Sequence, residues 1–274
     1  MSSVLATVDE RMPPLTEAEL AWVEELPNRG VEHLGWGVTM RQRAGYHLPD
    51  AYYEAMVARL CQSGVTWLDV GCGRDLFPHN RPLAETLAAR CGRVVGVDPD
   101  DTIDENEHLH ERIKQPIDQF ESEWMFDLVT MRMVAEHVAN PRAALERVAR
   151  HTRVGGKVVV YTVHRWSPAA VAARWTPFGW HHSIKRVLWR TEEKDTFPVV
   201  YRMNTRRQLA AWFAEAGFVE RHFEHLDDCR TLARFRGLHR CELALWRGLK
   251  GVGLHYPETC LLGVYERREG AQAI

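Results

Sequence analysis

A chain of 274 residues with 45% hydrophobic and 26% charged residues can bury a full core, and its composition is that of an ordinary globular protein. The formal net charge of −2 excludes a general attraction to nucleic acid, so no nucleic-acid partner is expected. The sequence shows no secretory signal, no apolar run of the ~18 residues that a membrane span needs and no metal-finger spacing among its six cysteines. We therefore expect a cytoplasmic protein with reduced thiols and without a metal.

The first 62 residues are predicted to form a helical N-terminal cap. Thr16 and Glu19 make a capping box in front of a short amphipathic helix, which Pro27 and the residues up to Gly30 bring to an end. A second helix is predicted over 49–62. The remaining residues, 63–274, are then expected to form the core.

From residue 65 onward, short apolar strands alternate with helices. Asn80 and Asn140 are suitable N-caps for helices over 81–90 and 141–151, and Thr205 with Gln208 predicts another helix that ends at Gly217. Strands are predicted over 65–70, 93–97, 111–117, 126–130, 157–162, 218–226 and 261–265, and a basic helix over 230–248. This alternation predicts an α/β fold, a doubly wound, mostly parallel seven-stranded Rossmann-like sheet.

An insertion interrupts the alternation between residues 164 and 207. It contains nine Lys and Arg but only three Asp and Glu, so it carries a net charge of +6 and leaves −8 for the rest of the chain. We interpret it as a lid suited to an amphiphilic acceptor with a carboxylate or phosphate, or alternatively as a subdomain with its own aromatic core. Its aromatic residues are Trp166, Trp175, Phe178, Trp180, Trp189, Phe197 and Tyr201.

The first strand of the core leads into a glycine turn. Gly71 and Gly73 allow a ligand to approach the backbone closely. A dinucleotide fingerprint would need a third glycine where this chain has Leu76, and no Gly-Lys-Ser/Thr follows to make a P-loop. Because Asp69 and Asp75 flank the turn, we expect it to repel a diphosphate and to attract a cationic ligand.

Asp98 ends the next predicted strand, 25 residues after Gly73. A carboxylate at that position of a doubly wound sheet accepts hydrogen bonds from the hydroxyls of a ribose. A ligand with a ribose, a positive charge and no diphosphate is S-adenosylmethionine, which we predict as the cofactor.

The sequence resembles the class I S-adenosylmethionine-dependent methyltransferases, especially the small-molecule "type 11" group. The resemblance rests on ordered blocks between residues 65 and 162 and extends loosely to about 266. These blocks are Leu68-Asp-Val-Gly-Cys-Gly73, Val95-Gly-Val-Asp98, Phe126-Asp-Leu-Val129 with Glu136-His137, and Gly155-Gly156.

The resemblance implies a cofactor site at the ends of the first, second and fourth strands. Its residues would be Asp69, Gly71, Cys72, Gly73, Asp98, Pro99, Thr130 and Met131. The chain departs from the family pattern after the third strand, where Ile117 is expected to stack on adenine and Asp118 to accept from its amine. Arg41, Arg43 and Tyr46 are expected to close over the methionine carboxylate.

Methyl transfer from a sulfonium is an in-line displacement in which a base helps only if the acceptor must lose a proton. His164 follows the fifth strand and is our candidate base, with His181 and His182 as alternatives; Glu136 and His137 are as well explained by structural roles. The predicted function is therefore methyl transfer to a small, amphiphilic or anionic acceptor. The alternatives are a non-catalytic cofactor-binding partner protein and an NAD-dependent oxidoreductase. The sequence indicates no oligomeric state.

Overall fold

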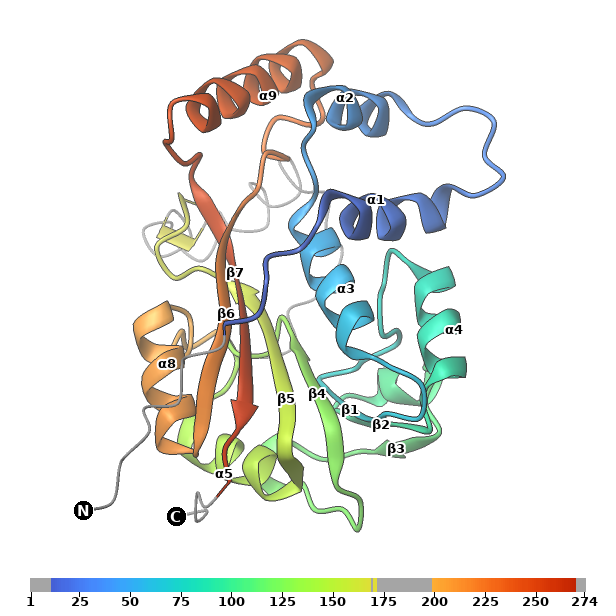
Figure 1. The fold of residues 1–274 in the computed structure, drawn as a ribbon, viewed down its shortest axis with the longest axis vertical. Coiled ribbons are helices and arrows are strands. Elements are labelled where there is room, and N and C mark those ends of the chain that lie inside the picture. Colours follow the sequence, from blue (N-terminus) through green and yellow to red (C-terminus); the bar gives the residue numbers. More distant parts are fainter. Residues whose placement is uncertain (1–10, 169, 172–198, 270–274) are drawn as a thin grey trace, which may run out of the picture.

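The computed structural model describes residues 11–168, 170–171 and 199–269, and a seven-stranded sheet forms its centre (Figure 1). The strand order is β3-β2-β1-β4-β5-β7-β6. The strands are β1 (Thr66–Val70), β2 (Arg93–Val97), β3 (Glu111–Ile113), β4 (Phe126–Arg132), β5 (Thr152–Val163), β6 (Phe218–Asp227) and β7 (Glu258–Arg267).

One strand runs against the others. β7 pairs antiparallel with both β5 and β6, whereas the pairs among β1 to β5 are all parallel. The carboxyl ends of the six remaining strands therefore lie at one edge of the sheet, where ligands of doubly wound folds bind. The predicted fold class is confirmed.

Four helices begin where the capping residues predict. α1 (Glu17–Glu25) has the Thr16 capping box, and α8 (Arg206–Glu215) is capped by Thr205. Asn80 and Asn140 cap α4 (Arg81–Arg90) and α5 (Pro141–His151), each with proline in the first turn. These helix starts were predictable because the caps satisfy backbone N–H groups that the helix itself leaves unpaired.

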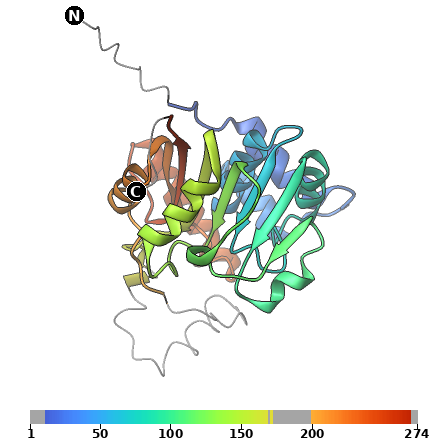
Figure 2. The ribbon, with the colours of Figure 1, turned by 90° about the horizontal axis from the view of Figure 1, so that it is seen from below.

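The helices cover both faces of the sheet (Figure 2). α1, α3 (Pro49–Leu60) and α4 pack with Trp67 in one hydrophobic cluster, and α5 and α8 pack with Leu68 in another. Trp67 and Leu68 are neighbours in β1 and point to opposite faces, as the two-residue period of a strand requires. α1 and α3 of the predicted cap thus share a core with the sheet, and the division at residue 62 stays a proposal.

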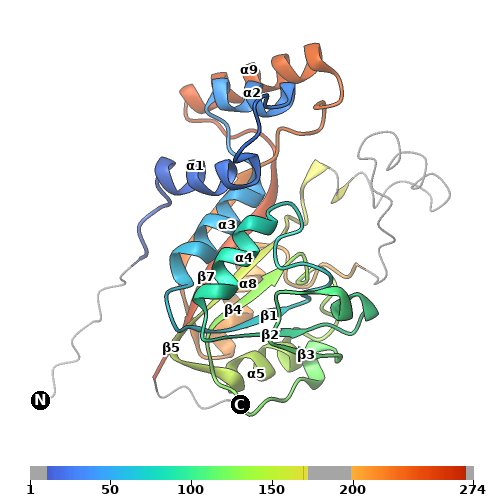
Figure 3. The same ribbon diagram turned by 90° about the vertical axis from the view of Figure 1, so that its right-hand side faces the viewer.

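Helix α2 (Trp36–Ala44) was not predicted. It packs against α9 (Arg236–Gly251), and the two helices lie side by side at one end of the molecule, beyond α1 (Figures 1 and 3). Short 3-10 helices occupy Leu26–Asn28, Asp101–Glu105 and Ile117–Gln119.

Several predicted bounds were wrong. β5 begins at Thr152, five residues before its predicted start, and β7 extends beyond 261–265 at both ends. The basic helix predicted over 230–248 is α9, which begins six residues later and ends three residues later. β3 stops at Ile113, four residues before Ile117, whereas β4 continues to Arg132, two residues beyond its predicted end. Most of the predicted lid lies outside the described residues, including Trp175, Phe178, Trp180, His181, His182, Trp189 and Phe197.

Candidate cofactor and acceptor site

The glycine turn after β1 is pressed against the segment that follows β4. Gly71 has a φ of +67°, and a Cβ there would lie 2.2 Å from Cγ2 of Val134. Gly73 has a φ of +43° and more open surroundings, its nearest neighbour being the Thr102 hydroxyl at 3.9 Å. Gly71 is therefore needed for packing and conformation, whereas Gly73 leaves backbone open for a ligand.

Asp98 lies directly at this turn, as predicted. Its Oδ2 accepts from the Gly73 amide at 2.9 Å and its Oδ1 from the Asp100 amide at 2.8 Å. A carboxylate oxygen can accept two hydrogen bonds, so the fixed Asp98 carboxylate retains capacity for both ribose hydroxyls. The neighbouring Pro99 is exposed beside it.

Cys72 turns its side chain away from the turn. Its Sγ packs so close to Gly96 that a Cβ there would lie 2.6 Å away, and burial raises the pKa of the thiol. Only the Cys72 backbone can therefore take part in a cofactor site. Its carbonyl accepts from the buried Asn106 amide at 3.3 Å, which also donates to the Gly73 carbonyl at 3.2 Å.

Asn106 is thus a residue of the turn that the sequence did not reveal. The side chain is fully buried and reaches the turn from the loop after Asp101–Glu105. An isolated asparagine in a loop has no spacing that marks it as a brace for a distant segment.

Asp69 belongs to a buried hydrogen-bonded chain on the α3 face. Its Oδ1 accepts from the Thr130 hydroxyl at 2.5 Å, which accepts in turn from the Trp67 indole at 2.7 Å. Burial raises the pKa of Asp69 to about 7. Asp69 is therefore only partly ionised near neutral pH, which weakens the expectation that its charge attracts a cationic ligand to the turn.

The side chains of Thr130 and Met131 do not stand at the end of their strand. Met131 is buried opposite Val70, on the face that α5 and α8 cover, and Thr130 is buried on the other face. The prediction that β4 ends there was wrong because the strand continues to Arg132. Met133 then follows with a φ of +52°, a strained conformation for a residue with a side chain. Contacts of Thr130 and Met131 with a cofactor stay a prediction.

Arg132 is part of an ion-pair network at the same edge. Its guanidinium donates to Asp50 of α3 at 2.9 Å, and Arg230 contacts the other oxygen of Asp50 at 3.2 Å and Asp228 at 2.7 Å. Burial acts to raise the pKa of Asp50, but the two arginines outweigh it and hold this pKa below its ordinary value. The network connects the cap, β4 and the segment between β6 and α9.

Two predicted contacts lie beyond the strand ends. Ile117 sits in a 3-10 helix, half-buried against the cluster that includes Phe120, and Asp118 beside it is exposed. Their predicted contacts with adenine are neither supported nor contradicted by this placement.

Tyr46 does not have the role predicted for it. Its hydroxyl donates to the Asp227 carbonyl at 3.1 Å and accepts from the Cys229 amide at 2.9 Å. Its ring packs edge-on against Trp246 with 5.1 Å between centroids. Tyr46 therefore fastens α2 to the α9 segment rather than closing over a cofactor.

His164 comes directly after β5 and borders an open hollow of about 330 Å³. Its backbone amide donates to Thr259 at 2.8 Å, and its ring lies 5.5 Å from that of His225, nearly perpendicular to it. The hollow is lined by His164, Trp166, Pro168, His255, Tyr256 and Pro257.

Glu136 holds the end of β5 in place. Its carboxylate accepts from the Thr162 hydroxyl at 2.8 Å, and Asn204 donates both to that hydroxyl at 2.8 Å and to the Val163 carbonyl at 2.9 Å. Burial raises the pKa of Glu136. These contacts give Glu136 a structural role, which the sequence had left open.

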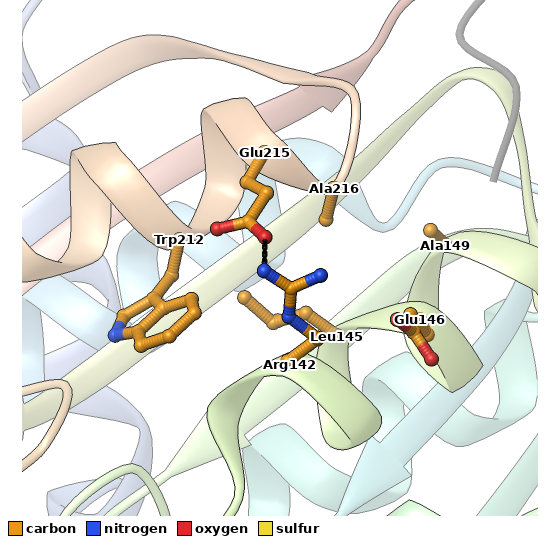
Figure 4. Close-up of a pocket in the computed structure, with 7 residues that line it drawn as sticks. All are labelled: Arg142, Leu145, Glu146, Ala149, Trp212, Glu215 and Ala216. Carbon is orange, nitrogen blue, oxygen red and sulfur yellow. Dashed lines mark ion pairs between the residues drawn. The ribbon is translucent and has the colours of Figure 1, made fainter. Parts of the chain in front are cut away.

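A further hollow, between α5 and α8, is formed around the ion pair of Arg142 and Glu215 (Figure 4). It has about 20 Å³, roughly the room of a single water molecule. None of the predicted site residues lines it.

Within the described part of the chain, no group of three or more His, Cys, Asp or Glu side chains is placed to hold a metal ion. No helix among the described residues has the length and apolarity to cross a bilayer.

Comparison with known proteins places this arrangement in a family. Residues 41–222 match the model of a family described as a methyltransferase domain. A ubiquinone biosynthesis O-methyltransferase of Rhodopseudomonas palustris (strain BisB18) is 34% identical over 143 residues, 46% of this chain and 54% of that protein. Its counterpart in Xanthomonas oryzae pv. oryzae (strain PXO99A) is 30% identical over 166 residues, 54% and 66% of the two chains. The chain thus spans between half and two thirds of the curated relatives that it matches.

Solved structures share the fold at low sequence identity. A geranyl diphosphate C-methyltransferase from Streptomyces coelicolor A3(2) in complex with Mg²⁺, geranyl diphosphate and S-adenosyl-L-homocysteine has a TM-score of 0.50 at 17% identity, over 96% of this chain and 91% of that chain. A complex of the Haloferax volcanii Trm112 methyltransferase activator with a methyltransferase gives 0.53 at 16% identity, over 86% and 96%. Together with the match over residues 41–222, this shows that the chain belongs to the methyltransferase-domain family, the class I methyltransferases that use S-adenosyl-L-methionine as cofactor.

Proposed function

We propose that this chain transfers the methyl group of S-adenosyl-L-methionine to a small acceptor that is amphiphilic or anionic. The observation that carries the proposal is the hydrogen bond from the Gly73 amide to Asp98, which fixes a carboxylate beside an open backbone turn, where we propose that it accepts from the ribose hydroxyls. The relatives named as O-methyltransferases make a hydroxyl the first acceptor group to test.

The hollow beside His164 is the proposed acceptor site. β4 separates β1 from β5 in the sheet, so these two strands lie about 10 Å apart, and the glycine turn and the end of β5 are at the same edge. Trp166 and Tyr256 give the hollow aromatic walls for an apolar part of the acceptor. The charges of Arg132 and Arg230 are balanced by Asp50 and Asp228, so the preference for an anionic group rests on the net charge of +6 of residues 164–207.

The reaction requires little covalent chemistry from the protein. With S-adenosylmethionine bound, the acceptor oxygen would take the methyl group in line as the bond from the methyl carbon to sulfur breaks, and the electron pair of that bond would stay on the sulfur of S-adenosylhomocysteine. The hydroxyl proton must go to a base, and His164 is the proposed one because its ring borders the hollow. Asp98 and the glycine turn contribute by positioning the donor.

Replacement of the base gives the first prediction. We expect His164→Ala to lower kcat by about 10²-fold on a hydroxyl acceptor, the lower end of what general base catalysis contributes, with unchanged affinity for the cofactor. The measurement is transfer of a labelled methyl group to a panel of phenols and carboxylates, read as the mass gain of one methyl. His33→Ala, an exposed histidine elsewhere, is the matched control and should behave as wild type.

The same assay distinguishes the alternative functions. Tight binding of S-adenosylmethionine without turnover of any acceptor would favour a non-catalytic cofactor-binding protein. Binding of NAD in preference to S-adenosylmethionine would favour an oxidoreductase. We do not expect this result, because the buried Leu76 stands where the dinucleotide fingerprint has its third glycine.

A further inference from the structure

One side of α9 is locked into the protein. Trp246 packs on Tyr46 and donates to Asp227 at 3.2 Å, while His239 lies with its ring 5.8 Å from that of Trp36. The buried Glu242 accepts from the Tyr256 hydroxyl at 3.0 Å. These contacts fix the orientation of the helix and decide which of its residues face outward.

The outward side carries a line of large apolar side chains. Leu238 and Leu245 are 50% and 56% exposed and lie seven residues apart, hence on one side of the helix. Phe235 before the helix and Val252 after it continue the line, followed by Leu254. These five are nearly half of the eleven large hydrophobic side chains that are exposed in the described part of the chain, so they form a concentration rather than a scatter.

The other border of the outward side is basic. Arg240 and Arg247 are exposed there, and neither forms a salt bridge with any described residue. Arg236 and Lys250 are also exposed, but they lie over the rings of Trp36 and Trp246, 5.9 and 4.9 Å from the ring centroids. The one carboxylate of the helix, Glu242, is buried. α9 is therefore cationic at its surface in a chain whose net charge is −2.

Nothing in the described structure covers this side. Between the two borders lie Gly237 and Gly248, where an added Cβ would meet no atom within 4 Å. α9 is the outermost element at its end of the molecule in two perpendicular views (Figures 1 and 3).

We propose that α9 and residues 252–254 dock on an anionic lipid bilayer. Apolar side chains at one border of a fixed helix enter the interface between headgroups and acyl chains, while arginines at the other border reach lipid phosphates. A second copy of this chain fits less well, because antiparallel pairing of two α9 helices about a twofold axis would bring arginines against arginines.

The position of this surface relates it to the proposed acceptor site. Val252 and Leu254 lead directly to His255, Tyr256 and Pro257, which line the hollow beside His164. Delivery of an amphiphilic acceptor from the bilayer to this hollow rests on the proposed function, whereas the docking itself does not.

The test is cosedimentation of the full chain with vesicles, which needs no acceptor. We expect binding to vesicles in which about a third of the lipid is phosphatidylglycerol, and much weaker binding to phosphatidylcholine alone. Leu238→Gln with Leu245→Gln, and Arg240→Ala with Arg247→Ala, should each lower the partition coefficient about tenfold or more. Val154→Gln and Arg268→Ala, exposed residues at the opposite edge of the sheet, should leave it unchanged.

Three results would overturn the proposal. One is wild-type binding that is absent, or equal on both vesicles. Another is that both double variants, the leucine one and the arginine one, bind vesicles as the controls do and melt at the wild-type temperature. The third is a dimer in sedimentation velocity that Leu238→Gln with Leu245→Gln dissociates, or retention of a DNA duplex that only the arginine variant abolishes, because either assigns the surface to another partner.

Discussion

At the scale of single residues, burial decides the charge of several carboxyl groups. Glu54 is 8% exposed and accepts from the Asn80 amide at 2.6 Å, and burial raises its pKa to about 7. Burial likewise raises the pKa of Asp69 to about 7, although the hydrogen bond from Thr130 acts to lower it. Asp50 is shifted the opposite way because two arginines face it. The sequence shows where a carboxylate occurs but not which of these environments surrounds it.

Glu54 predicts a pH dependence of stability. Its folded-state pKa lies above the unfolded value, so the folded protein binds this proton more tightly, and the contribution is fully present below pH 4.5 and lost as pH rises to about 7. We expect Glu54→Gln, which can still accept from Asn80, to lack this loss and to be more stable than wild type above pH 7 by about 1–3 kcal/mol.

Urea unfolding at pH 5 and pH 8 measures the difference, with the exposed Glu25→Gln as control. A Glu54→Gln variant whose stability follows wild type at both pH values would show that Glu54 is charged in the folded protein.

At the scale of elements, the network of Asp50 joins three parts of the chain. Asp50→Ala would leave Arg132 partly buried without its carboxylate partner, while Arg230 keeps Asp228. Because these side chains retain some exposure, we expect a loss of about 1–3 kcal/mol in the free energy of unfolding, less than for a fully buried pair.

Two comparisons make this prediction specific. Asp101→Ala removes an exposed partner of Lys114 and should leave the free energy of unfolding unchanged within the error of the measurement. Adding Arg132→Met to Asp50→Ala should recover part of the loss, since the unpaired guanidinium is then gone. A pairwise explanation would be refuted if the double variant lost more free energy of unfolding than Asp50→Ala and Arg132→Met lose when each is made alone and the two losses are added.

The sequence predicted elements whose signals are local and missed those that depend on distant contacts. α1, α4, α5 and α8 were predictable from their caps. α2 has only nine residues, contains Gly37, and none of its residues is fully buried, so its sequence carries a weak helix signal. It is stabilised by packing against α9, about 200 residues further along the chain. The site shows the same division: Gly71, Gly73 and Asp98 follow from spacing, whereas Asn106 and Arg132 depend on tertiary contacts.

At the scale of the whole molecule, the parallel strands bring the components of the proposed reaction to one edge. The glycine turn, the Asp50 network and the hollow beside His164 follow β1, β4 and β5, and the lobe of α2 and α9 stands at the same end because β6 runs parallel to β5. A donor site, an acceptor site and a docking surface on one edge would let an amphiphilic acceptor reach the methyl group without crossing the protein.

The most direct test is calorimetric titration of S-adenosylmethionine into the wild type, Asp98→Ala and Asp98→Asn, with NAD as competitor. We predict one site in the wild type, a loss of affinity of about tenfold or more in Asp98→Ala with little change in thermal melting, partial retention in Asp98→Asn, and no competition by NAD. Wild-type affinity in Asp98→Ala, or displacement of the ligand by NAD, would contradict a ribose-binding role for Asp98 at the glycine turn.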